Sequence, residues 1–510
     1  MKIVYITFVP YAKLRGTDMF ESAELGHKID RQTFDRDVPM LREDLLNAQY
    51  DLLRSGKFSV LIVVGGVDGA GKSETVSVLN EWMDPRHIHT HAFSEPYDEE
   101  SERPYMWRFW RALPPKGSTG IFYGAWHSAP ILGRVLGNLK SAQLDQATEE
   151  IIRFERMLSD EGTLILKFWF HLSKEQQKKR LKELQKDPRT RWRVTDSDWE
   201  RFKSYDKFRK ISEHFLRKTS TAEAPWIVVE GLDHNYRTLT VGRLLLQAIR
   251  ERLDDEPVKR LPDKIPPIPP QIDGKDVLTA LPTARAISKG KYEKELESWQ
   301  GRLNTLTRHP RFKKFSVVLV FEGQDAAGKG GAIRRVMGAL DARIYQGIPV
   351  AAPTEEERAQ PYLWRFWRHI PRRGYFAIFD RSWYGRVLVE RVEGFCSESD
   401  WARAYSEIND FELQLVRNKT ILVKFWLQIN KEEQLKRFKE REKTSFKRFK
   451  ITEEDWRNRE KWDLYHTAVC DMVDRTSTEI APWRIVAADN KYAARIDILK
   501  TVVKNIEAVL

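Results

Sequence analysis

The sequence GQDAAGKG, from Gly323 to Gly330, follows the apolar run FSVVLVF at Phe315–Phe321 and precedes apolar residues at helical spacing. A short run of β-branched and apolar residues predicts a buried strand, and the spacing after Gly328 predicts a helix. A glycine-rich turn between a strand and a helix points backbone N–H groups and the positive helix end toward a phosphate. The stretch therefore predicts a P-loop in which Lys329 neutralises phosphate charge.

A second copy of this loop, GVDGAGKS, runs from Gly66 to Ser73 and lies 257 residues earlier. The same offset relates the two WRFWR segments, Trp107–Arg111 and Trp364–Arg368. Short repeat arrays have periods of roughly 20 to 50 residues, so this long period predicts a duplicated domain.

The segment between the copies, KRLPDKIPPIPPQIDG at Lys259–Gly274, is rich in proline. Proline excludes a regular helix or a central strand, so the segment is interpreted as a stiff linker. We predict a first domain at residues 1–253, a linker at 254–282 and a second domain at 283–510.

Strands and helices are expected to alternate in each half. Phe376–Phe379 and Thr420–Ile429 have strand-like composition, and the charged stretch Lys431–Lys443 is helical in pattern. Apolar strands that alternate with helices indicate a parallel sheet covered on both faces. The predicted fold class is α/β, with two tandem three-layer α/β/α domains.

Composition narrows the class of partner. The chain has 510 residues and a net charge of +13, which suggests a polyanion: nucleic acid, an acidic membrane surface or a phosphate polymer. No apolar run approaches the roughly 20 residues that span a bilayer. Two cysteines, Cys396 and Cys470, give no disulfide framework and fit a reducing cytoplasm. The cysteines have no Cys or His pattern nearby and are interpreted as structural. His369 and His466 show no metal-ligand spacing and are interpreted as ordinary surface or core residues.

Two carboxylates in the second half are candidate metal ligands. Asp325 lies within the loop, and Asp380 ends the apolar strand of AIFDRSWYGR at Ala377–Arg386. Hard cations such as Mg²⁺ prefer carboxylate and phosphate oxygens, and Gly330 offers no hydroxyl where P-loops usually have one. Arg381 and Arg386 follow the aspartate and suit bidentate phosphate contacts.

The first half lacks this set. Tyr123 and Gly124 stand at the positions of the strand-end aspartate and its arginine. One remaining carboxylate should hold a metal and phosphates poorly, so we expect the first half to be weakly active or non-catalytic. Its degenerate loop comprises Gly66, Asp68, Gly71, Lys72 and Ser73.

The combination of GQDAAGKGG, WRFWRHIPRRG, FDRSWYGRV and KEEQLKRFKEREKTSFKRFKITEEDWRNREKWDLY resembles the type-2 polyphosphate kinases. More narrowly, it resembles the tandem-domain polyphosphate:AMP phosphotransferases, over nearly the whole chain. The resemblance implies a thymidylate-kinase-like P-loop fold with helical lids. It also implies reversible phosphoryl transfer from inorganic polyphosphate to a purine nucleoside monophosphate, AMP to ADP, with Mg²⁺ or Mn²⁺ as cofactor. Asp325, Lys329, Asp380 and Arg381 are then the catalytic positions, and assembly into homo-oligomers is common in the family.

A polyphosphate chain needs a basic channel, and a lid that closes over phosphates would supply charge to it. The candidate phosphate-binding residues are Gly323, Gly328, Gly330, Arg372, Arg373, Arg386, Arg437, Arg441, Lys447, Arg448 and Lys450. A solvated helix face with Glu–Lys pairs is the alternative interpretation for the helical part of this set.

Other functions stay open on the sequence alone. An ATP-dependent nucleoside monophosphate kinase or a polyphosphate-dependent nucleoside diphosphate kinase would use the same loop, and donor and acceptor panels separate them. A nucleic-acid-binding protein is the alternative of a different class, but no recognised nucleic-acid motif is visible. The intact second loop disfavours a purely structural scaffold. Phosphoanhydride exchange is close to thermoneutral, so the direction of the reaction is not fixed.

Overall fold

The computed structural model describes residues 19–255, 275–282, 286–445, 449 and 451–510. Contacts divide the chain into two compact units. The first comprises Met1–Glu95, Ala112–Glu256 and Ala359–Pro361, and the second comprises Pro96–Arg111, Pro257–Arg358 and Tyr362–Leu510. Most of the predicted linker lies outside the described residues, so the boundaries at 253 and 283 stay a prediction.

The first unit is built on a five-stranded parallel sheet of order β2-β3-β1-β4-β5. Its strands are β1 Val60–Gly66, β2 Ile88–Ala92, β3 Thr119–Tyr123, β4 Leu164–His171 and β5 Trp226–Glu230. The helices of this half of the chain are α1 Arg31–Ser55, α2 Lys72–Trp82, α3 Asp98–Ser101, α4 Trp107–Ala112, α5 Ser128–Leu136, α6 Ser141–Asp160, α7 Lys174–Lys186, α8 Asp196–Lys203, α9 Tyr205–Thr219 and α10 His234–Asp254.

The second unit repeats this sheet, in the order β10-β9-β6-β8-β7. Its strands are β6 Ser316–Gly323, β7 Tyr345–Pro349, β8 Phe376–Asp380, β9 Thr420–Gln428 and β10 Trp483–Ala487. The helices are α11 Lys289–Thr307, α12 Lys329–Met337, α13 Glu355–Arg358, α14 Trp364–Trp367, α15 Val389–Glu393, α16 Glu398–Arg417, α17 Lys431–Glu442, α18 Glu453–Glu460, α19 Trp462–Thr476 and α20 Lys491–Glu507.

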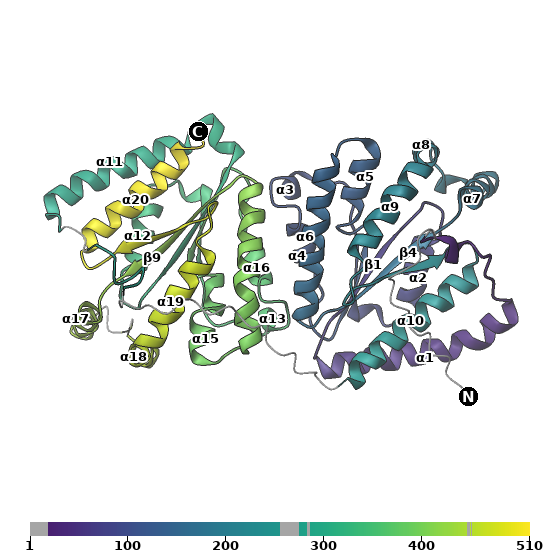
Figure 1. Ribbon diagram of the computed structural model, residues 1–510, viewed down its shortest axis with the longest axis horizontal. Helices are drawn as coiled ribbons and strands as arrows, with labels where there is room; N and C mark the ends of the chain where they lie inside the picture. Colours follow the sequence, from purple (N-terminus) through teal and green to yellow (C-terminus); the bar gives the residue numbers. More distant parts are fainter. Residues whose placement is uncertain (1–18, 256–274, 283–285, 446–448, 450) are drawn as a thin grey trace. The chain divides into compact units, whose positions relative to one another are not determined.

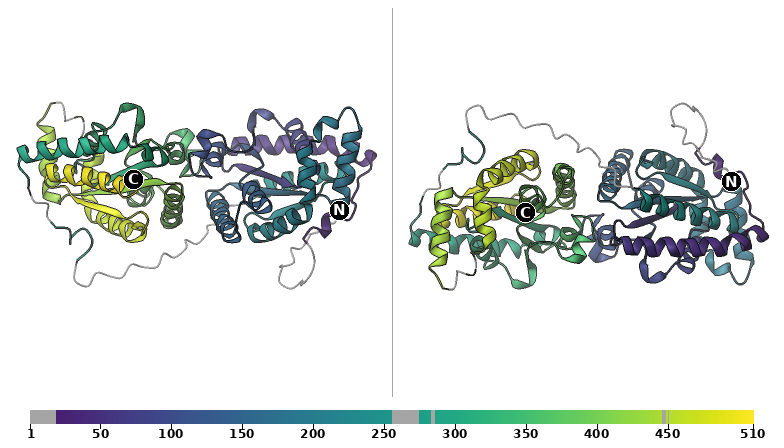
Figure 2. Two further views of the ribbon diagram at one scale, coloured as in Figure 1. Left: turned by 90° about the horizontal axis from the view of Figure 1, so that it is seen from above. Right: turned by 90° about the horizontal axis from the view of Figure 1, so that it is seen from below.

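Helices cover both faces of each sheet, which gives the three layers expected from the sequence (Figures 1 and 2). In the second unit α11, α12 and α20 lie on one face, and α16 and α19 lie on the other (Figure 1). The central strand is fully enclosed, because Val317–Phe321 has no exposed side-chain surface. A strand that is buried on both faces has a continuous apolar sequence, as this one does. The two parallel sheets confirm the predicted α/β fold, and their common strand order confirms the tandem duplication.

Strand register decides which predicted residues can meet. Phe321 of β6 pairs with Asp380 of β8, so the glycine loop after β6 and Asp380 lie at the same, carboxyl edge of the sheet. Ligands of open parallel sheets bind at this edge. Arg372 and Arg373 precede Phe376, the first residue of β8, and therefore lie near the opposite edge.

A buried ion pair recurs at the same place in both units. Lys424 of β9 donates to Glu412 of α16 at 2.7 Å, and Lys167 of β4 donates to Glu155 of α6 at 2.6 Å. All four side chains are at most 1% exposed. The pair is independent of the differences between the two glycine loops, so it belongs to the scaffold.

Within the described residues, every helix is too short or too polar to cross a bilayer.

Candidate active site

The second glycine loop is held open by its own backbone conformation. Gly323 and Gly328 have φ angles of 149° and 111°, a range that favours glycine. Gly328 caps the start of α12, so the positive end of the helix faces the loop. Lys329 donates from Nζ to the carbonyl oxygens of Gly323 at 2.5 Å and Gln324 at 3.3 Å. The lysine therefore already lies across the mouth of the loop.

Arg437, predicted to bind phosphate, instead supports the loop from beneath. It is 3% exposed and donates to the carbonyl oxygens of Ala326 and Ala327 at 3.0 and 3.1 Å. Its other contacts are the carbonyl oxygens of residues 488 and 489 and the carboxylate of Glu433. These bonds use the donors of the guanidinium, so Arg437 positions the loop.

Asp325 and Arg381 face each other across the loop. Arg381 donates to Oδ1 of Asp325 at 3.4 Å, and Asn458 of α18 donates to Oδ2 at 2.9 Å. Arg381 has a φ of 65°, a left-handed conformation that costs a non-glycine residue free energy. Strained backbone of this kind is concentrated at functional sites.

Asp380 lies beside the residue that follows the lysine. A Cβ built on Gly330 would be 4.0 Å from Oδ2 of Asp380. The carboxylate thus stands close to where the hydroxyl residue of an ordinary P-loop would reach a metal ion. Asp325 and Asp380 line the same cavity, and both are oxygen ligands of the kind a hard divalent cation prefers.

Glu322 is a buried carboxyl group behind Arg381. Ser382 donates to it at 2.8 Å, and burial raises its pKa against the opposing effects of Ser382, Lys329 and Arg381. In the first half the corresponding positions are Gly65 and Ala125, so this link is missing there. Glu322 is a positioning residue for the strained turn at Arg381.

A cavity of about 490 Å³ opens above the loop. It is lined by Asp325, Lys329, Gly330, Gly331, Arg334, Asp380, Arg381, Arg437, Glu440, Arg441, Asp455, Lys491, Ala494 and Arg495, among others. Cations outnumber carboxylates in this lining, which suits an anionic chain. Sequence reasoning found Arg441 but missed Arg334, Lys491, Arg495 and the neighbouring Asn458, because single basic or amide residues on distant helices carry no local signal.

A smaller cavity of about 90 Å³ adjoins the first one. Its wall is mostly apolar and aromatic and includes Leu388, Trp426, Trp462, Tyr465 and Val469. Gln324, Asp325 and Arg381 line both cavities. The strongest candidate for a reacting centre is therefore the junction at Asp325 and Arg381.

Three predicted phosphate-binding arginines line neither of the two cavities. Arg372 and Arg373 lie near the opposite edge of the sheet, and Arg372 contacts the ring and hydroxyl of Tyr375. Arg386 pairs with Glu390 at 3.3 Å and stacks over Tyr362. Arg372 and Arg373 therefore lie away from the loop, and Arg386 has Glu390 and Tyr362 as its partners. Lys447, Arg448 and Lys450 lie outside the described residues.

The first glycine loop also has glycines with positive φ angles, but a side chain occupies the space in front of it. A Cβ on Gly71 would be 2.3 Å from the guanidinium of Arg237, whereas one on Gly328 would have no described atom within 4 Å apart from its chain neighbours and the backbone of its own helix. Arg237 is 2% exposed and is paired with Glu74. Arg180 and Arg193 also contact Glu74, at 3.5 and 3.4 Å. In the second half Gly331 and Ala494 stand where Glu74 and Arg237 stand here.

The remaining carboxylate of the first loop is also engaged differently. Arg201 of α8 donates to Oδ2 of Asp68 at 2.7 Å, and Lys72 lies 3.7 Å from Oδ1. Arg201 occupies the position of Asn458, so a neutral donor in one half is a cation in the other. Lys72 itself donates to the carbonyl oxygens of Gly66 and Val67, as Lys329 does to its own loop. Ser73 is the second residue of α2.

The sequence pattern of the family described as Polyphosphate kinase 2 (PPK2) matches residues 28–257 and 286–509. The two matches cover both halves of the chain. They agree with the duplication inferred from the glycine loops.

Curated relatives with similar sequences extend over nearly the whole chain. The "Polyphosphate:AMP phosphotransferase" of Pseudomonas aeruginosa is 58% identical over 491 residues, which is 96% of this chain and 99% of that protein. The protein of the same name from Acinetobacter johnsonii is 38% identical and covers 91% and 95%. A solved structure titled as a putative polyphosphate kinase 2 from Pseudomonas aeruginosa matches with a TM-score of 0.86 and 55% identity, over 96% of this chain and 99% of that one.

Proposed function

The chain belongs to the polyphosphate kinase 2 family, and we propose that it transfers a phosphoryl group from inorganic polyphosphate to AMP, which gives ADP. The names of the full-length relatives support AMP as the acceptor. The observation that carries the proposal is the junction of a cationic cavity and an aromatic cavity at Asp325 and Arg381. The cationic cavity suits an anionic phosphate chain, and the aromatic cavity suits a nucleoside.

In this proposal the polyphosphate lies in the cationic cavity above the loop. The backbone N–H groups of the loop and Lys329 bind the terminal phosphates, and Arg495 and Lys491 of α20 neutralise the chain further along. The nucleotide enters from the aromatic side, so its phosphate meets the donor at Arg381. Phosphoryl transfer requires alignment and charge neutralisation more than covalent help, and this arrangement provides both.

We propose Mg²⁺ as the cofactor, with Mn²⁺ as a substitute. Asp325 and Asp380 would hold it, because both carboxylates line the cavity and Asp380 approaches Gly330. When bound, the ion supplies charge neutralisation of the phosphate oxygens. Asn458 and Arg381 keep Asp325 oriented, and the strained turn at Arg381 keeps its guanidinium beside the loop.

We assign the reaction to the second half and a non-catalytic role to the first. The first half lacks both Asp380 and Arg381, and the mouth of its loop holds Arg237. We further propose a cytoplasmic location, which the two unpaired cysteines favour. Assembly into homo-oligomers stays an expectation from the resemblance.

The test is a panel of donors and acceptors with purified full-length protein. Polyphosphate, AMP and Mg²⁺ should give ADP, and EDTA should abolish the product. If ATP alone supports the reaction, the chain is an ATP-dependent nucleoside monophosphate kinase and the proposal is wrong. ADP and GDP belong in the same panel, because the "ADP-polyphosphate phosphotransferase 2" of Rhizobium meliloti is 38% identical over 221 residues. Faster use of ADP than of AMP would favour that second candidate.

A further inference from the structure

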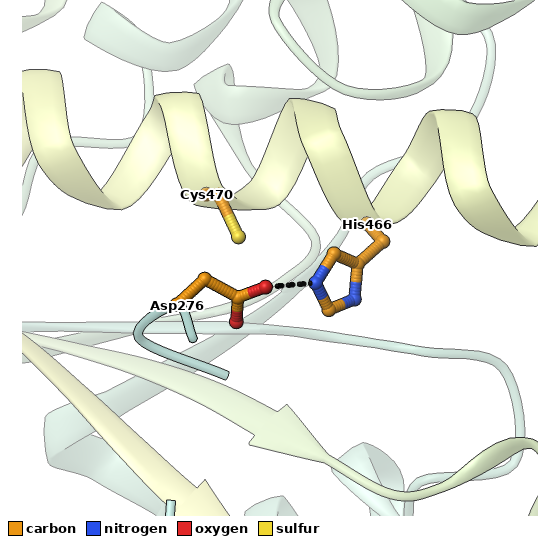
Figure 3. Close-up of side chains that lie close together, drawn as sticks. All are labelled: Asp276, His466 and Cys470. Atoms are coloured by element: carbon orange, nitrogen blue, oxygen red, sulfur yellow. Dashed lines mark hydrogen bonds and ion pairs between the residues drawn. The ribbon is translucent and has the colours of Figure 1, made fainter. Parts of the chain in front are cut away.

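Three side chains with metal-binding groups lie together outside the reacting centre, in the second unit. His466 and Cys470 are one helical turn apart on α19, and both point toward Asp276 (Figure 3). Nε2 of His466 lies 2.6 Å from Oδ2 of Asp276, and one ligand atom from each of the three residues lies within 4.8 Å of the others. The side chains of Asp276 and His466 are 6% and 25% exposed, and Cys470 is buried.

The first half offers a natural comparison for this cluster. Met19, Arg209 and Glu213 stand 257 residues before Asp276, His466 and Cys470. There the backbone N–H of Met19 donates to Glu213 at 3.1 Å, so an equivalent segment meets an equivalent helix through an ordinary hydrogen bond. Contact of the segment with its helix therefore does not require these residue types. An oxygen, a nitrogen and a sulfur ligand occur together only in the second of the two places.

We propose that Asp276, His466 and Cys470 form a binding site for a zinc-like divalent cation, with water as the fourth ligand. Thiolate, imidazole and carboxylate are the ligands that Zn²⁺ takes in proteins, whereas Mg²⁺ and Ca²⁺ require oxygen. The site is distinct from Asp325 and Asp380, which offer oxygen only. The sequence-based interpretation of His466 and Cys470 as residues without a metal-ligand pattern missed it, because the third ligand is 190 residues away.

Backbone hydrogen bonds hold one carboxylate oxygen of Asp276, and the other oxygen faces His466. Oδ1 accepts from the N–H groups of Leu278 and Thr279, both at 2.8 Å. Outer hydrogen bonds of this kind orient metal-ligating carboxylates. Oδ2 is the oxygen that faces His466, and a cation would replace the proton now shared between them.

Binding must also release the thiol proton of Cys470. Burial and the nearby carboxylate of Asp276 raise the pKa of this thiol to about 12. A bound cation takes the thiolate and displaces this proton.

The site lies next to the smaller cavity of the reacting centre. His466 and Leu278 line that cavity, together with Trp462 and Tyr465. A bound cation would join the segment at residues 275–282 to α19 and so fix one wall of the proposed nucleotide pocket. This consequence rests on the proposed function, but the cation site itself does not.

Cobalt is the probe, because a thiolate bound to Co²⁺ gives a charge-transfer absorption that oxygen ligands do not give. Full-length protein is stripped with EDTA, reduced, exchanged into excess Mg²⁺ to fill carboxylate sites, and titrated with Co²⁺. We expect the thiolate band to saturate at one equivalent, to disappear on addition of Zn²⁺, and to be lost in Cys470→Ser. Cys396→Ser is the matched control and should keep the band, because Cys396 contacts the carbonyl oxygen of Arg386 and lies outside the cluster.

A double variant separates a cation site from a simple hydrogen-bonded contact. His466→Arg with Cys470→Glu places on α19 the two residues that α9 of the first half carries at these positions. It should fold, as judged by circular dichroism, and bind no Zn²⁺ in the presence of excess Mg²⁺. Absence of a thiolate band in the native chain, a band that survives in Cys470→Ser, or equal Zn²⁺ affinity of native and double variant would each overturn the proposal. None of these outcomes bears on whether AMP is the acceptor.

Discussion

The two glycine loops show how little a P-loop motif says about an active phosphate site. The first loop matches the general pattern more closely, because Ser73 follows its lysine, whereas Gly330 follows the second. Yet the guanidinium of Arg237 lies against Gly71, and the space beside Gly328 is open among the described residues. An anion site is defined by what lies around the loop as much as by the loop itself.

The second loop is also surrounded by more cationic side chains than the first. Five cations that line the second cavity, namely Arg334, Arg381, Arg441, Lys491 and Arg495, correspond to Ser77, Gly124, Leu184, His234 and Thr238 in the first half. The arginines that the first half places at its loop are each paired with Glu74 or Asp68. Ion pairs occur in both halves, since Arg381 and Lys491 also contact carboxylates, but only the second half has these five cations along its cavity.

Removing one aspartate from each half should affect the two halves most differently. Asp380→Asn should lower turnover about 10³-fold, because the proposed Mg²⁺ would lose a carboxylate ligand where phosphate charge develops. Asp68→Asn should leave turnover within about twofold, since that carboxylate is paired with Arg201. Initial rates of ADP formation at saturating Mg²⁺ measure both. Equal losses in the two variants would show that both halves do chemistry.

The scaffold, in contrast, should respond alike in both halves. Lys424→Met and Lys167→Met each leave a buried glutamate without its partner and should cost about 3 kcal/mol of unfolding free energy. Hydrogen exchange in β9 and β4 measures the two effects separately. A much smaller cost in one half would mean that its buried pair is not equivalent.

This destabilisation should depend on pH. Burial already raises the pKa of Glu412, and removal of Lys424 takes away the main opposing influence. The folded variant then keeps a proton that the unfolded chain loses above pH about 4.3. Its unfolding free energy relative to the native chain should therefore fall as pH rises from about 5 to 8. A difference that is constant over this range would contradict a proton held by Glu412.

Arg381 allows activity and stability to be separated. Its φ of 65° is matched by Gly124, with 69°, at the corresponding position. Arg381→Gly should lower turnover about 10²-fold through loss of the charge. It should leave stability unchanged or raise it by up to about 1 kcal/mol, because the left-handed turn suits glycine. Thermal unfolding and ADP formation test this, and a variant that loses stability instead would contradict a strained turn. Gly124→Arg is the control and should confer no activity on Asp380→Asn.

Much of this architecture could be predicted from the sequence, because its signals are local. The run at Phe315–Phe321 became β6, Thr420–Ile429 became β9, and the loss of a strand-end aspartate at Tyr123 is visible in alignment with Asp380. Arg372 and Arg373 could also have been placed correctly, since residues that precede a parallel strand lie at its amino edge.

The contacts that fill or open the loops could not be predicted in this way. Arg237 and Ala494 stand on the last helix of their halves, more than 160 residues from the loops they meet. Arg437 looked like a phosphate ligand because its sequence neighbours are basic, yet the fold turns it toward loop carbonyls. A single charged residue on a helix has no periodicity or spacing from which its distant partner can be inferred.

Removing Arg237 from the first loop should restore only weak phosphate binding there. Glu74→Gly with Arg237→Ala installs the residues of the second half and removes the guanidinium from beside Gly71. The freed N–H groups and Lys72 should then bind a phosphate anion weakly. Calorimetric titration of the full chain with tripolyphosphate should show an additional weak site, while turnover stays unchanged because Tyr123 and Gly124 still supply no metal ligand and no cation. Glu74→Gln, which leaves Arg237 in place, is the control and should bind as the native chain does. If the double variant gains no site although it folds normally, Arg237 is not what closes the first loop.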